Sequence, residues 1–150
     1  MDLILWRHAD AEDGAPDLER ELTDKGHKQA KQMAAWLREH MPEGTRVLVS
    51  PAARAQQTAR ALTGKFETVQ AIEPGASAEA VLTAAGWPQA HHAVLVVGHQ
   101  PTLGEVAALL ISGKPGEWSL KKGAIAWLSG RHRGHHWDIV LRAALSPDLL

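Results

Sequence analysis

Short apolar runs alternate with segments of helical periodicity along this chain. Three runs are almost wholly apolar, as is typical of strands buried on both faces of a parallel sheet: residues 3–6, 47–49 and 93–97. Three other segments carry apolar side chains at helical spacing, which gives each an apolar face to lay on a sheet: residues 30–41, 52–62 and 103–111. A shorter helix is predicted from its N-cap Ser77 to Ala85, with Gly86 as the C-cap.

The last third of the chain has a different pattern. Two strand-like runs, 124–128 and 137–141, are separated by residues 129–134 and predict a hairpin that closes one edge of the sheet. Residues 66–72 are a further strand candidate. The whole pattern predicts a three-layer α/β/α fold whose sheet is mostly parallel with an antiparallel C-terminal edge. No repeat or linker divides the chain, so residues 1–150 are expected to form a single domain.

Composition narrows the chemistry that this chain can carry. A chain of 150 residues is long enough to bury a sizeable core without a covalent staple. The absence of cysteine excludes disulfides, thiolate metal sites and a cysteine nucleophile, which leaves His, Arg, Asp, Glu and Ser. The net charge of -1 provides no general basic field, so neither nucleic acid nor an anionic membrane is expected as a partner.

Location and assembly follow from the same inventory. The chain opens without a basic leader, and no apolar run approaches the roughly 20 residues needed to cross a bilayer. We therefore expect a cytoplasmic protein. Packing of the predicted helices uses most of the apolar residues, which favours a monomer.

Polar clusters directly follow the three buried strands. Arg7 and His8 follow the first, Arg54 lies in the cluster 50–54 after the second, and His99 follows the third. Because the carboxyl ends of parallel strands meet at one edge of a sheet, we expect these four side chains to lie close together. A guanidinium fork binds phosphoryl oxygens, and a neutral imidazole supplies a nucleophilic nitrogen. The clusters thus predict a site that handles phosphate.

Two of these clusters also resemble helix starts. Ser50 is a good N-cap with Pro51 at the first helical position, and Pro101 with Thr102 follows His99 in a similar way. Helix N-termini at these points would direct free amides at an anion. Phosphate is again the expected ligand.

A series of motifs runs along nearly the whole chain: Arg7 and His8; Leu22, Thr23, Gly26, Gln29 and Ala30; Ser50, Pro51, Arg54, Ala55, Gln57 and Thr58; Gly98, His99 and Pro101. In their content and order, these motifs resemble the histidine phosphatase superfamily, and within it the small SixA-type phosphohistidine phosphatases. Ala9 departs from the usual superfamily pattern, which has Gly. The resemblance implies a phosphoglycerate mutase-like fold.

The resemblance also implies a role for each matched side chain. His8 would accept the phosphoryl group, Arg7 and Arg54 would hold it, and a protonated His99 would donate a further hydrogen bond. The chemistry agrees, since cations beside His8 keep its imidazole neutral and positioned charges carry much of phosphoryl transfer. Neither a metal ion nor another cofactor is expected.

The substrate is best approached through its leaving group. A phosphoester expels an alkoxide and benefits from a carboxylic acid that protonates it, whereas phosphohistidine expels an imidazole and needs less help. In the superfamily that this chain resembles, members with broader substrate ranges carry a helical cap. Residues 61–93 of this chain leave little room for such a cap. We therefore expect hydrolysis of a phosphohistidine on a signalling or phosphotransfer protein, through a covalent phospho-His8. The alternatives are a phosphatase of a small phosphomonoester and a phosphate-recognition module without turnover.

Three carboxylates are candidates for an acid in the ester alternative. Glu73 follows the strand candidate 66–72 and is the more ambiguous of them, while Asp10 and Glu12 read most simply as solvated loop residues. The segment 10–20 is expected to be among the least ordered parts of the chain. The His-rich and Arg-rich segment 131–136 could bind a metal or an acidic partner, but a solvated hairpin tip is its ordinary interpretation.

Overall fold

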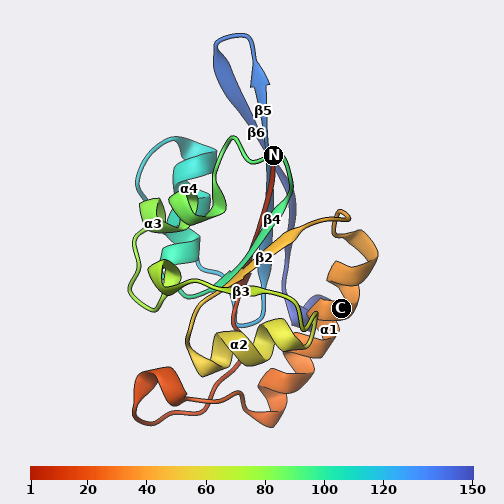
Figure 1. The fold of residues 1–150 in the computed structure, drawn as a ribbon, viewed down its shortest axis with the longest axis vertical. Coiled ribbons are helices and arrows are strands. Elements are labelled where there is room, and N and C mark those ends of the chain that lie inside the picture. Colours follow the sequence, from red (N-terminus) through yellow and green to blue (C-terminus); the bar gives the residue numbers. More distant parts are fainter.

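The computed structural model describes residues 1–150 as a six-stranded sheet between two layers of helices (Figure 1). The elements, in chain order, are β1 (Asp2–Arg7), η1 (Asp17–Glu19), α1 (Asp24–His40), β2 (Arg46–Val49), α2 (Ala53–Arg60), β3 (Glu67–Thr68), η2 (Gln70–Ile72), α3 (Ala78–Ala85), β4 (Val94–Gly98), α4 (Thr102–Ser112), β5 (Ile125–Arg133), β6 (His136–Leu145) and η3 (Pro147–Leu149), where η marks a 3-10 helix.

The sheet has the strand order β3-β2-β4-β1-β5-β6. Strands β3, β2, β4 and β1 are parallel, whereas β5 pairs antiparallel with β1 and β6 pairs antiparallel with β5. The three-layer fold with a mostly parallel sheet and an antiparallel C-terminal edge is therefore confirmed. Because β1, β4 and β2 are adjacent and parallel, the residues that follow them emerge at the same edge.

Each face of the sheet is covered by its own pair of helices, as Figure 1 shows. Side chains of β1 alternate between the two faces, so that Ile4 and Trp6 pack with α1 and α2 while Leu3 and Leu5 pack with α3 and α4. All four side chains are fully buried. This two-sided burial explains why the strand reads as a continuous apolar run rather than an alternating one.

The short segment between α2 and β4 holds only β3, η2 and the eight-residue helix α3. It contains no large helical cap, as the sequence predicts. The strand candidate 66–72 is shorter than expected, because only Glu67–Thr68 pairs with β2 and Gln70–Ile72 turns into a 3-10 helix. No helix is both long and apolar enough to cross a bilayer.

Helix ends agree with the local sequence signals in three of four places, one of which is the start of α4 at Thr102, directly after Pro101. Ser77 Oγ accepts a hydrogen bond from the Ala80 amide at 3.1 Å and caps α3, and Gly86 ends that helix with a φ of 70°. The predicted start of α2 at Ser50 is wrong, because the helix begins at Ala53. The Ser50 hydroxyl is instead bound within the site described below.

The C-terminal hairpin is longer than its apolar pattern indicates. Strands β5 and β6 pair as far as Arg133 opposite His136, with one register shift between Trp127 and Leu128, so the connection is a tight turn rather than the loop 129–134. Asp2 at the start of β1 pairs with Ser129, and the rest of the hairpin extends beyond this point (Figure 1). Residues 131–137 of this extension are all exposed, so no buried apolar run marks them in the sequence.

Close approach of α1 to the segment after β1 depends on Gly26. A Cβ at Gly26 would lie 2.0 Å from the backbone oxygen of Asp10, which no relaxation of a side chain can relieve. Gly26→Ala is therefore expected to lower the free energy of unfolding by about 2 kcal/mol. Urea unfolding of this variant beside Gly64→Ala tests the expectation, because a Cβ at Gly64 meets no atom within 4 Å. Equal stability of the two variants would contradict it.

Candidate active site

A cavity of about 210 Å³ lies at the carboxyl ends of β1, β2 and β4. It brings together the four predicted residues Arg7, His8, Arg54 and His99. The other residues that line it are Ala11, Asp13, Arg20, Pro74, Gln100 and Lys122. No group of three or more His, Asp or Glu side chains is arranged to hold a metal ion. The histidines of segment 131–136 do not form such a group either.

His8 occupies the centre of this cluster, one residue beyond β1, and is 7% exposed. Its Nδ1 lies 2.7 Å from the backbone oxygen of Ala9, which can only accept, so Nδ1 carries the proton. Nε2 therefore bears a free lone pair in the neutral ring, and Arg54 Nε donates to it at 3.3 Å. Burial, followed by the charges of Arg54 and Arg7, lowers the pKa of His8 to about 4. The expectation of a neutral imidazole is met, with desolvation as its largest cause.

The amides of His8 and the two residues after it donate to three neighbouring segments. The His8 amide donates to Gly98 of β4 at 3.0 Å, and the Ala9 amide donates to the hydroxyl of Thr58 in α2, also at 3.0 Å. The next amide, that of Asp10, donates to Gln29 Oε1 of α1 at 2.9 Å. No residue other than glycine has a positive φ, so Ala9 fits its position without backbone strain.

His99 lies beside His8, with 5.2 Å between the ring centroids. Its Nε2 is 2.7 Å from Ser50 Oγ, and its Nδ1 is buried without a hydrogen-bond partner. Burial, followed by the neighbouring His8 and Arg54, lowers the pKa of His99 to about 3. The expectation of a protonated His99 is therefore wrong for the ligand-free protein. A bound dianion would favour the charged form and shift this equilibrium back.

Arg7 reaches the cavity from the last position of β1. Its Nη1 donates to the backbone oxygen of Leu120 at 2.8 Å, which fixes one side of the guanidinium. Its Nε is buried and has no partner. A buried donor without a partner is unfavourable, because it loses its hydrogen bond to water on folding.

Arg54 is bound by an acidic residue of the loop that follows β1. Its Nη1 donates to the Asp17 backbone oxygen at 2.8 Å and its Nη2 to the Asp17 carboxylate at 3.2 Å. The same carboxylate accepts from Arg20 Nε at 3.1 Å. Arg20 thus lines the cavity as a third arginine, although sequence reasoning placed it in a poorly ordered segment. Only these tertiary contacts identify it.

The candidate acids lie outside the cavity lining. Asp10 accepts from Lys122 at 2.8 Å and from the Thr23 hydroxyl at 2.8 Å, and these bonds hold the pKa of its carboxyl below the ordinary value. Glu12 is exposed, and Glu73 contacts Gln70 while its neighbour Pro74 lines the cavity. The carboxylate that does line the cavity is Asp13, which the sequence did not single out.

The predicted free helix amides are present only in part. The Ala52 amide donates to Ser50 Oγ at 3.2 Å. At the start of α4, the Leu103 amide donates to the His99 backbone oxygen and the Gly104 amide to Gln100 Oε1. The Ala53 and Arg54 amides in the first turn of α2 donate to no protein group.

Comparison with known proteins decides the family. The profile of the histidine phosphatase superfamily (branch 1) matches residues 3–76. The phosphohistidine phosphatase SixA homologue of Haemophilus influenzae is 34% identical over 85% of this chain and 87% of its own length. SixA of Escherichia coli is 34% identical over 76% of each chain. This chain belongs to the histidine phosphatase superfamily. Accordingly, it is a phosphatase.

The solved structures agree with this assignment. The structure of the protein histidine phosphatase SixA complexed with tungstate matches with a TM-score of 0.79 and 29% identity, over 99% of both chains. A phosphoserine phosphatase from Entamoeba histolytica, at 17% identity, shares the fold with a TM-score of 0.70 over 97% of this chain. The phosphoglycerate mutase-like fold expected of a histidine phosphatase is confirmed.

The buried histidines of this histidine phosphatase predict an acid-sensitive fold. Because the pKa values of His8 and His99 are lowered in the folded state, the unfolded chain binds more protons below pH about 6.5. The contribution of the two neutral histidines to the free energy of unfolding is complete above pH about 6.5. It is lost as the pH falls toward the pKa values that they have in the folded state. Between pH 6.5 and 5, each histidine should lower the free energy of unfolding by about 2 kcal/mol. Urea unfolding at several pH values should show a shallower slope for His99→Gln than for wild type or the exposed control His27→Gln; parallel slopes would contradict the prediction.

The Asp17 contact predicts competition with an anion for Arg54. Asp17→Asn removes the negative charge while keeping the size of the side chain, so phosphate or vanadate should inhibit the variant about three- to tenfold more tightly than wild type. Glu19→Gln, an exposed change in the same 3-10 turn, serves as the matched control. Weaker inhibition of Asp17→Asn would mean that Asp17 orders the loop for anion binding instead.

Proposed function

We propose that this phosphatase hydrolyses phosphohistidine on a signalling or phosphotransfer protein, through a covalent phosphate on His8. The observation that carries the proposal is the lone pair of His8 Nε2 among the guanidinium groups of Arg7, Arg20 and Arg54. A neutral nucleophile surrounded by cations is suited to attack on a phosphoryl dianion.

Anion binding is the part of the proposal that the geometry supports first. Arg7 and Arg54 both line the cavity, where their guanidinium groups can bind oxygens of one phosphoryl group. His99, protonated once the dianion is bound, adds a further donor beside His8. The similar SixA structure contains tungstate, a tetrahedral oxyanion of the kind that such a site would hold.

The reaction then proceeds in two displacements. In the first, His8 Nε2 forms a bond to phosphorus while the P–N bond of the substrate breaks, and the departing imidazole takes a proton from solvent. In the second, water adds to phosphorus and the bond to Nε2 breaks. Inorganic phosphate leaves, the proton of the water goes to phosphate or solvent, and His8 returns to its neutral form.

The leaving group favours phosphohistidine over an ester. Departure of an alkoxide calls for an acid at the site, yet Glu73 is not among the residues that line the cavity. Asp13 is the carboxylate at the lining, and it is exposed. The short segment between α2 and β4 leaves the cavity without a cap, which suits a histidine on the surface of another protein.

The decisive experiment follows loss of acid-labile phosphate from a histidine-phosphorylated carrier protein, with chelator present. Wild type should hydrolyse it at an unchanged rate in chelator, and His8→Ala should be slower by at least about a thousandfold because the nucleophile is removed. His27→Ala, an exposed change on α1, should match wild type. An aryl phosphomonoester assayed in parallel should turn over much more slowly.

Two results would overturn this proposal. Rapid ester turnover with an untouched carrier would identify a small-molecule phosphatase. Stoichiometric phosphate binding with no product and no label on His8 would identify a recognition module. Under the proposal, rapid quenching during turnover should instead recover acid-labile phosphate on His8.

A further inference from the structure

A second, larger cavity of about 580 Å³ adjoins the catalytic one and shares Arg7 and Lys122 with it. No hydrophobic residue lines this cavity, which we call the basic groove. Its charged lining consists of Arg7, Lys25, Lys28, Lys121, Lys122 and Asp148. Five cations against one carboxylate stand out in a protein whose net charge is -1.

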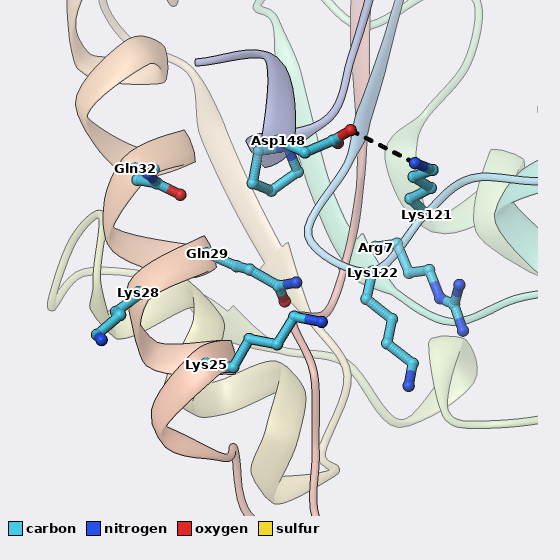
Figure 2. A pocket seen from close by; sticks show the side chains of 9 residues that line it. Arg7, Lys25, Lys28, Gln29, Gln32, Lys121, Lys122 and Asp148 are labelled. Atoms are coloured by element: carbon cyan, nitrogen blue, oxygen red, sulfur yellow. Dashed lines mark hydrogen bonds and ion pairs between the residues drawn. The ribbon is translucent and has the colours of Figure 1, made fainter.

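Figure 2 shows how these side chains are arranged. Lys25 extends from α1 toward Arg7 and Lys122, and Lys28 lies farther out along the same helix. Lys121 pairs with Asp148 at 3.4 Å and Lys122 pairs with Asp10 at 2.8 Å, whereas neither Lys25 nor Lys28 makes an ion pair in the structure. The groove thus keeps two exposed ammonium groups that no protein carboxylate neutralises.

The position of Lys25 is unfavourable for the helix itself. It occupies the first turn of α1, where the positive end of the helix dipole disfavours a cation. Lys25 faces the cationic pair Arg7 and Lys122 across the groove, whereas Lys28, one turn later on α1, also lines the groove but points away from that pair (Figure 2). Repulsion of this kind lowers the stability of the free protein and is relieved when an anion binds.

We propose that the basic groove binds an acidic segment of the protein that presents the phosphohistidine. This inference rests on the proposed function and deepens it, since the groove begins at Arg7, beside the phosphoryl site. Carboxylates that flank a phosphohistidine would reach the groove while the phosphoryl group occupies the cavity. A groove of this volume, with exposed and separated lysines, suits an extended acidic segment better than one small anion.

The test uses two synthetic phosphohistidine peptides of equal length, one flanked by Glu and the other by Gln. Wild type should hydrolyse the acidic peptide with a kcat/KM about tenfold higher at about 50 mM salt, and the preference should shrink at about 300 mM. Lys25→Glu/Lys28→Glu should abolish or reverse the preference. Lys31→Glu, the same charge change on α1 outside the groove, should keep it.

The double variant is expected to fold, because both changes are on the surface and an acidic residue in the first turn favours the helix. Phosphoramidate, a small P–N substrate without carboxylates, provides the control for the phosphoryl site, and its turnover should change less than about threefold. The groove proposal would be overturned if the double variant lost as much activity on phosphoramidate as on the acidic peptide. It would also be overturned if wild type hydrolysed the two peptides with equal kcat/KM. Failure to hydrolyse either peptide while an aryl ester is hydrolysed would instead overturn the proposed function.

Discussion

The position of His8 in the candidate site depends on the backbone hydrogen bonds of the segment that follows β1. The amides of His8, Ala9 and Asp10 donate in turn to Gly98, Thr58 and Gln29, which belong to β4, α2 and α1. The carbonyl of His8 accepts from the Gly123 amide at 3.1 Å, just before β5. These bonds leave the imidazole little freedom to shift without breaking packing on both sides of the sheet. The polar motif residues Thr58 and Gln29 thus act on the site through its backbone.

Desolvation and positive charge act together on the two buried histidines. Both effects hold the pKa of His8 and of His99 low, and desolvation is the larger of the two. An anion that neutralises the arginines lining the cavity would complete such a site. Asp17 partly substitutes for that anion by binding Arg54 and Arg20. Stability and ligand affinity are consequently linked at this one place.

The sequence predicted the sheet and its functional edge because both follow from local rules. Runs buried on two faces locate β1, β2 and β4, and the carboxyl-end rule then brings Arg7, His8, Arg54 and His99 together. Helix caps were predictable where a single hydroxyl meets an amide three residues away, as at Ser77.

Tertiary contacts explain what the sequence could not predict. Ser50 has the signature of an N-cap, but its hydroxyl lies against His99, 49 residues away. Arg20 has no periodic pattern around it and is placed by Asp17 and the carbonyl of Glu12. The charge of His99 depends on its burial beside another imidazole, and this follows only from three-dimensional packing.

The long β5–β6 hairpin places its tip at the end of the molecule opposite the candidate site. Since β5 runs antiparallel to β1 and continues past Asp2, its tip at Gly134 and His135 projects from the end of the sheet opposite the cavity (Figure 1). Nothing lies within 4 Å of a Cβ placed at Gly134. A fluorophore, affinity tag or inserted loop at this tip would therefore lie far from the cavity and leave it open, which makes the tip a suitable point of attachment for immobilising the protein on a surface.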